Sequence, residues 1–181
     1  MAEQEYDYII VGAGSSGCVL ANRLSADPTK RVLLLEAGPR DLNPWIHIPI
    51  GYGKTMFNQT LNWGYKTEPE QGVNGRSIYW PRGKTLGGSS SINGLIYIRG
   101  QQADFDDWAA RGNPGWGWED VLPFFRRSEC QMRGADSYHG ADGELAVSDV
   151  GESDTLCDAF IAGAEQAGFP RNDDFNGADQ E

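Results

Sequence analysis

Three glycines near the N-terminus have the spacing of a turn that can hold a diphosphate. In YDYIIVGAGSSGCVLANRL, Gly12, Gly14 and Gly17 follow five mostly apolar residues. The first permits a tight strand-to-helix turn, the second lets the backbone approach a diphosphate, and the third lets the helix pack close to the strand. The helix N-terminus adds a partial positive charge, and Ser15 and Ser16 could add hydroxyl donors. Alone, this pattern also fits a structural turn that binds nothing.

An acidic residue lies where a dinucleotide fold needs one. Glu36 ends the next apolar stretch, RVLLLE, 19 positions after Gly17. Its carboxylate is placed to accept hydrogen bonds from both ribose hydroxyls of an adenosine, and its charge would repel a 2′-phosphate. The context therefore favours a dinucleotide-binding turn and disfavours NADP, whereas NAD and FAD both fit.

A second glycine-rich stretch, RGKTLGGSSSINGLIYIRG at 82–100, has the chemistry of another ligand-binding loop. Gly87 and Gly88 permit close approach of the backbone, and the serines after them could cap a following helix while donating to a ligand. Asn93 would lie in the first turn of that helix, and Arg82 would supply a cation. A flexible loop capped by serines is the alternative.

The apolar pattern predicts the elements that position these residues. Segments 6–11 and 31–35 predict buried strands and 15–26 a helix, which together make a βαβ unit of the usual size for a parallel crossover. Residues 38–62 contain three prolines and predict an irregular excursion, which is usually functional when ordered. Short strands are expected at 63–67, 77–80 and 143–148, and helices at 102–111, 119–128 and 154–167, the last one capped by Ser153 or Asp154.

Composition limits the class of protein. The 181 residues carry a net charge of −11 with no run of Lys or Arg, which argues against a nucleic acid or an anionic membrane as partner. Three cysteines without close spacing predict neither a disulfide framework nor a zinc site, and Cys18 and Cys157 fall in predicted helices, where buried thiols are common. Neither a signal peptide nor a membrane span is expected. The expected location is therefore cytoplasmic, with at most peripheral contact with the inner membrane.

The motifs resemble the glucose–methanol–choline (GMC) oxidoreductase family. Four matches occur in order along nearly the whole chain: GAGSSG, EAG, NWGYKTEPE with NGRSIYWPRGKTLGGSSSINGLIYIRG, and HGADGELAVS. The resemblance implies an α/β fold, in which a Rossmann-like FAD-binding domain of discontinuous segments receives an inserted α+β substrate-binding domain. It assigns residues 1–150 to FAD-binding segments, with the βαβ unit at 6–36 and the flavin loop and helix at 81–100, and 151–181 to the start of the substrate-binding domain.

The resemblance also implies which residues hold FAD. The family's diphosphate turn matches Gly12, Gly14, Ser15, Ser16 and Gly17. Its ribose-binding acid matches Glu36, with Ala37 beside it. The loop and helix along the flavin match Arg82, Leu86, Gly87, Gly88, Asn93, Gly94, Leu95 and Ile96. Some members attach FAD covalently through a histidine just before the motif asparagine. Ile92 occupies that position, so FAD is expected to bind non-covalently. No metal site is expected, because NDDFNG at 172–177 lacks the remaining ligand positions of a calcium loop.

The activity implied is hydride transfer from a primary alcohol, a CH–OH donor, to FAD and then to a quinone or O₂. Within the family, the bacterial primary-alcohol dehydrogenases match best. A choline or sugar-alcohol dehydrogenase and a flavin-dependent lyase or photoenzyme relative are alternatives. Two further alternatives are a NAD-dependent dehydrogenase domain and a non-catalytic binding fragment whose partner is the rest of the same polypeptide.

The chain alone is expected to be inactive towards alcohols. A doubly wound sheet needs more parallel strands than the two predicted here, so we expect an incomplete piece of a larger fold. The family's catalytic histidine pair, or His and Asn, lies beyond residue 181. Neither histidine of the chain is assigned to catalysis: His139 is expected to be structural, and His47 to be packed or half-exposed.

Overall fold

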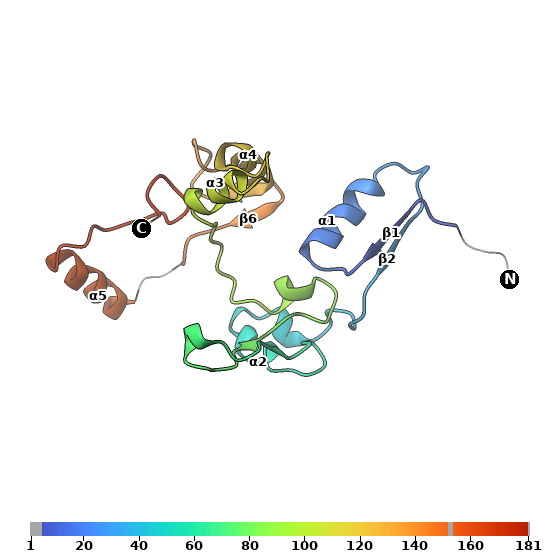
Figure 1. Cartoon of the computed structure of the whole chain (residues 1–181), viewed down its shortest axis with the longest axis horizontal. Coiled ribbons are helices and arrows are strands. Elements are labelled where there is room, and N and C mark those ends of the chain that lie inside the picture. The colour runs from blue at the N-terminus through green and yellow to red at the C-terminus, as the bar shows by residue number, and fades with distance from the viewer. Residues whose placement is uncertain (1–4, 152–153, 181) are drawn as a thin grey trace. The chain divides into compact units, whose positions relative to one another are not determined.

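The computed structural model describes residues 5–151 and 154–180, which belong to two units, Met1–Ile96 and Tyr97–Glu181. Figure 1 shows the elements of both units. The predicted boundary near residue 150 separates domains of the complete family fold, and it stays a prediction. Among the described residues, every helix is too short or too polar to cross a bilayer.

The βαβ unit is present as predicted, but its strands are not buried as expected, because Ile10 is the only buried residue in the two strands. Strands β1 (Tyr8–Val11) and β2 (Val32–Leu35) pair in parallel, and helix α1 (Ser15–Leu24) packs against both. The helix lies along one face of the strand pair (Figure 1). Ile10 is buried on that face, whereas Val11 on the other face is 83% exposed. One apolar face of this strand pair is therefore left open to solvent, although parallel sheets are normally covered on both faces.

The excursion at 38–62 is more regular than its prolines suggested. It contains two 3₁₀ turns, η1 (Pro44–Ile46) and η2 (Pro49–Gly51), and a short helix, α2 (Tyr52–Thr55). Each 3₁₀ turn has its proline at the start, where the missing N–H would have no partner anyway. Beyond the excursion, the two predicted short strands are present with a third 3₁₀ turn between them: β3 (Tyr65–Lys66), η3 (Gln71–Val73) and β4 (Tyr79–Trp80). The structure adds that these strands pair antiparallel.

The prediction of a helix within 81–100 is wrong, because the helical part is much shorter than expected. Only a single 3₁₀ turn forms, η4 (Gly88–Ser91), and Asn93 lies beyond it. Residues 94–100 are neither helix nor strand. Leu95 adopts a left-handed φ of 63°, which a right-handed helix does not allow. Periodicity alone could not exclude a helix here, because the apolar run is short.

The second unit confirms the predicted helices and adds one strand. Trp118 is 4% exposed and packs with Phe105 and Phe125, so an aromatic cluster holds two of the helices together. Strand β5 was not predicted, and it pairs in parallel with β6. The elements are α3 (Gln102–Ala110), α4 (Trp118–Ser128), β5 (Glu129–Gln131), β6 (Leu145–Val147) and α5 (Thr155–Gln166).

Helix α5 differs from expectation in what it buries. Asp154 caps it by accepting the Leu156 N–H at 2.8 Å, whereas Ser153 lies outside the described residues. Leu156 and Phe160 belong to the predicted apolar stripe, yet they are 79% and 80% exposed. Cys157 is exposed too, so the expectation of a buried thiol is wrong there.

A buried charged network links distant parts of the second unit. Arg99 Nη2 lies 2.7 Å from Glu129 Oε2, and both side chains are at most 1% exposed. His139 Nδ1 lies 3.0 Å from Glu129 Oε1, and its Nε2 lies 2.8 Å from Asp174 Oδ2. Because both ring nitrogens face carboxylates, the imidazole satisfies both contacts only when it carries two protons. The network supports a structural role for His139.

The NDDFNG segment is a turn bound to the network. Besides the contact of Asp174 with His139, Asn176 Oδ1 accepts the Arg99 N–H at 2.8 Å and its Nδ2 donates to Tyr97 O at 3.0 Å. In the described ranges no group of three or more His, Cys, Asp or Glu side chains could hold a metal ion. The segment thus joins the C-terminal loop to the start of the unit.

The stability of the protein should depend on the protonation of His139. Burial lowers the pKa of His139, but hydrogen bonds and charge attraction from Glu129 and Asp174 outweigh burial, so the pKa is raised above its ordinary value near 6.5. A raised folded-state pKa means that the stabilisation is complete below about pH 6.5 and is lost as pH rises through the folded-state pKa. We expect the melting temperature to fall across that interval, as measured by circular dichroism. In His139→Gln the melting temperature should change less with pH over this interval. If it fell with pH as steeply as in the wild type, His139 would not be the group responsible.

Candidate functional site

The first glycine turn is held by close backbone contacts. The Gly12 N–H donates to Leu35 O at 2.7 Å, and its φ of 94° requires glycine. A Cβ at Gly17 would lie 1.9 Å from Gly12 O, so only glycine fits there as well. Gly14 is the N-cap of α1. Among the described residues, no side chain caps this helix, and its first turn contains no acidic residue. The helix N-terminus therefore presents N–H groups and a partial positive charge to a ligand.

Glu36 is oriented by backbone N–H groups beside this turn. Its Oε2 accepts the Ala13 N–H and its Oε1 accepts the Gly38 N–H, both at 2.8 Å. An ionised carboxylate offers about four acceptor positions, so about two remain for the hydroxyl groups of a ligand. The structure thus fixes the carboxylate next to the glycine turn and leaves it able to bind.

The second glycine stretch lies directly against the first. The Gly87 N–H donates to Ala13 O at 2.8 Å. Gly88 has a φ of 59°, and a Cβ on it would lie 2.8 Å from Gly14 Cα. The two motifs, more than 70 positions apart in sequence, therefore meet with no room for a side chain between them.

These segments line a cleft of about 570 Å³ within the first unit. This volume is typical of sites for small molecules and cofactors. Half of the residues that line it are among those predicted from sequence: Gly12, Gly14, Glu36, Ala37, Arg82 and Gly88. The other half are Val11, Leu35, Trp63, Tyr65, Gly83 and Ser89.

The remaining predicted residues do not line the cleft. Some are sequence neighbours of residues that line the cleft, and they lie either in the first turn of α1 or in the second glycine loop: Ser15, Ser16, Gly17, Leu86 and Gly87. The others follow η4 and are exposed: Asn93, Gly94, Leu95 and Ile96. Their predicted contact with a flavin stays a prediction.

Trp63 and Tyr65 form an aromatic wall that the residue-level predictions missed. Their rings stack at 5.9 Å with an interplanar angle of 4°. Lys84 Nζ lies 4.6 Å from the centre of the Trp63 ring. The available signal was the W-x-Y spacing in NWGYKTEPE, because residues two apart in an extended segment share a face. Aromatic rings, a carboxylate, a cation and a helix N-terminus around one cleft suit a nucleotide.

The histidines contribute nothing to this cleft. His47 is exposed, and its Nε2 lies 2.6 Å from Asp41 O, in place of the packed or half-exposed setting that was expected. His139 belongs to the second unit and is engaged by Glu129 and Asp174. Neither is assigned to chemistry.

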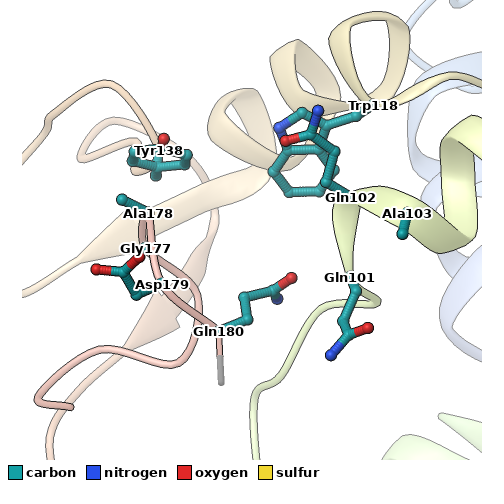
Figure 2. Close-up of a pocket in the computed structure, with 9 residues that line it drawn as sticks. All are labelled: Gln101, Gln102, Ala103, Trp118, Tyr138, Gly177, Ala178, Asp179 and Gln180. Atoms are coloured by element: carbon teal, nitrogen blue, oxygen red, sulfur yellow. The ribbon is translucent and has the colours of Figure 1, made fainter. Parts of the chain in front are cut away.

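A second pocket, of about 320 Å³, lies in the second unit, and Figure 2 shows the side chains around it. The pocket is lined by Gln101 and the first residues of α3, Gln102 and Ala103, by the loop at 177–180, and by Trp118 and Tyr138. Gln180 Nε2 lies 3.4 Å from both Arg99 O and Gly100 O. The pocket contains none of the predicted site residues.

Comparisons with known proteins give a consistent result. A family profile described as GMC oxidoreductase matches residues 6–181. The chain is 55% identical over 177 residues to an alcohol dehydrogenase (acceptor) of Pseudomonas putida, covering 97% of this chain and 32% of that protein. It is 47% identical over 178 residues to an oxygen-dependent choline dehydrogenase of Photobacterium profundum, covering 97% and 31%.

A solved structure gives the same picture. The crystal structure of pyridoxine 4-oxidase from Mesorbium loti is 38% identical, with a TM-score of 0.85 over 95% of this chain and 34% of that chain. The chain therefore spans about a third of the length of the curated relatives it matches.

Proposed function

This chain belongs to the GMC oxidoreductase family, and from that premise we propose that it is the FAD-binding N-terminal part of an enzyme that oxidises a primary alcohol. One observation carries the proposal: both glycine turns, Glu36 and Arg82 meet at a single cleft of cofactor size. When bound, FAD would accept hydride from the CH–OH carbon and pass electrons to a quinone or O₂. The alcohol substrate and the rest of the polypeptide are its proposed partners.

The residues of the cleft fit the adenosine diphosphate half of FAD. The N-terminus of α1 would hold the diphosphate, because the contact of Gly14 with Gly88 leaves the backbone bare of side chains there. Glu36 would accept hydrogen bonds from ribose hydroxyls. Trp63 would supply an apolar wall, and Arg82 a cation. Ile92 is 4% exposed and carries no nucleophile, which supports non-covalent binding.

A primary alcohol is favoured over choline as the substrate. The support is the higher identity to the Pseudomonas alcohol dehydrogenase, 55% against 47% for the choline dehydrogenase of Photobacterium. Choline is the second candidate. As part of the same proposal we place the protein in the cytoplasm, because its three cysteines, all within the described residues, are free thiols.

Titration of the purified chain with FAD tests the proposal. We expect FAD binding, detected by quenching of flavin fluorescence, and a loss of about tenfold or more in affinity for Glu36→Ala, because charge-assisted hydrogen bonds to the ribose disappear. Glu68→Ala removes an exposed carboxylate outside the cleft and serves as the matched control. Equal affinities of the wild type and Glu36→Ala would contradict the ribose assignment. Preference for NAD over FAD would contradict the cofactor assignment.

A further inference from the structure

Asn62 is a buried amide behind the cofactor cleft. The residue is 3% exposed, and it is not among those that line the cleft. It lies between the aromatic wall and the start of the second glycine stretch, opposite Gly83 in an antiparallel bridge. Flanking hydrogen bonds complete this short ladder, from Trp63 N–H to Arg82 O at 2.9 Å and from Lys84 N–H to Leu61 O at 2.7 Å.

The amide oxygen of Asn62 holds both of these segments. Oδ1 accepts the N–H of Gly64 and the N–H of Arg82, each at 2.9 Å. Gly64 lies between Trp63 and Tyr65, and it adopts a φ of 66°. One oxygen atom therefore fixes the backbone at the two stretches that carry the aromatic wall and the cation to the cleft.

The amide nitrogen anchors Asn62 to the excursion. Nδ2 donates to Met56 O and, at 2.9 Å, to the Tyr79 hydroxyl, which itself donates to Met56 O at 2.8 Å. Each amide atom thus makes two contacts. Exchanging the oxygen and the nitrogen would turn an NH₂ group towards two N–H donors, so the hydrogen-bond pattern fixes the orientation. Aspartate would keep the two acceptor contacts, but its second oxygen would face the carbonyl oxygen of Met56 in place of a donor.

Backbone contacts connect the strand ladder at Asn62 to the diphosphate turn. A Cβ at Gly83 would lie 2.1 Å from Gly88 O, and the Gly83 N–H donates to Ser89 Oγ at 3.0 Å. Gly88 in turn packs against Gly14. A displacement of residues 62–64 would therefore also displace the glycine turns, because the backbone contacts between these segments are too close to absorb it.

We propose that Asn62 is a positioning residue for the dinucleotide cleft, and this inference rests on the proposed function. The amide sets the spacing between Trp63, Arg82 and the glycine turns, and it does so without touching the ligand. Its loss should therefore weaken dinucleotide binding, and restoring the acceptor oxygen alone should recover part of the lost affinity.

The experiment is FAD titration of the purified chain with three variants, each checked for folding by circular dichroism. Asn62→Ala leaves the N–H groups of Gly64 and Arg82 without a partner, and we expect FAD affinity to fall about tenfold or more. Asn62→Asp should bind FAD at least about threefold more tightly than Asn62→Ala, because it keeps both acceptor contacts, but it should not reach the wild-type affinity, because its second oxygen faces Met56 O. Tyr79→Phe is the matched control: it removes one partner of Nδ2, and should lower the melting temperature while leaving FAD affinity near the wild-type value.

The outcomes separate this inference from the proposed function. Absence of FAD binding by the wild type would overturn the proposed function and the role of Asn62 with it. FAD binding that is equally tight in the wild type and in Asn62→Ala would overturn only the positioning role. If Asn62→Ala does not fold, an affinity for Asn62→Asp no better than that of Glu36→Ala would overturn it as well.

Discussion

Gly17→Ala should disrupt the first glycine turn and abolish measurable FAD binding. The added Cβ would lie 1.9 Å from Gly12 O and 3.0 Å from Gly12 C, and both are backbone atoms that cannot rotate away. Overpacking usually costs about 1–3 kcal/mol, and a clash with backbone should reach or exceed the upper end. Urea unfolding would measure the loss of stability, and flavin fluorescence the loss of binding.

Gly163→Ala is the matched control for this substitution. Gly163 lies inside α5, and a Cβ on it would have no atom within 4 Å among the described residues. Because alanine favours a helix interior over glycine by about 0.8–1 kcal/mol, this variant should be slightly more stable than the wild type. The same Gly→Ala substitution should thus destabilise the protein at position 17 and stabilise it at position 163. Retention of both stability and FAD binding by Gly17→Ala would contradict the geometry of the turn.

Glu129→Gln should destabilise the second unit by about 3–5 kcal/mol, because it leaves the buried Arg99 guanidinium without its counter-charge. Glu129 also accepts hydrogen bonds from His139 and, at 3.2 Å, from the Gly140 N–H. Glutamine keeps the size of the side chain, so the measured change reports charge and hydrogen bonding more than volume. Urea unfolding followed by circular dichroism would measure it.

Asp107→Asn gives the comparison at the surface. Asp107 Oδ2 lies 2.7 Å from Arg111 Nη2, a distance equal to that of the buried pair, but the two side chains are 54% and 73% exposed. Exposed ion pairs one helical turn apart contribute about 0.3–0.5 kcal/mol. Similar losses in Asp107→Asn and Glu129→Gln would show that burial does not set the contribution of the Glu129 pair.

The βαβ unit was predictable because its signals are local. Apolar runs at β1 and β2, the glycine spacing and the placement of Glu36 each lie within about 30 residues, and the structure places them as expected. The contact of Gly88 with Gly14 joins distant segments, and spacing alone does not reveal it. Only the family resemblance placed both glycine turns on one cofactor.

Other features depend on partners far along the chain. Nothing in the three residues of β5 distinguishes Glu129 as buried, since its partners Arg99 and His139 lie 30 and 10 positions away. The apolar run after η4 resembled a helix, yet Leu95 takes a left-handed conformation. In α5 the periodicity correctly predicted a helix, but it did not reveal that Phe160 would stay exposed. Periodicity indicates a face and says nothing of what covers it.

The hydrogen bond from Gly87 to Ala13 has a consequence for the order of assembly. It closes a loop of more than 70 residues, whereas the βαβ unit forms from neighbours in sequence. Chain entropy opposes such closure, and contacts between distant residues form slowly. A dinucleotide that touches both glycine turns would oppose reopening of that loop. The cofactor would then act as a removable cross-link between two stretches of chain that entropy tends to separate.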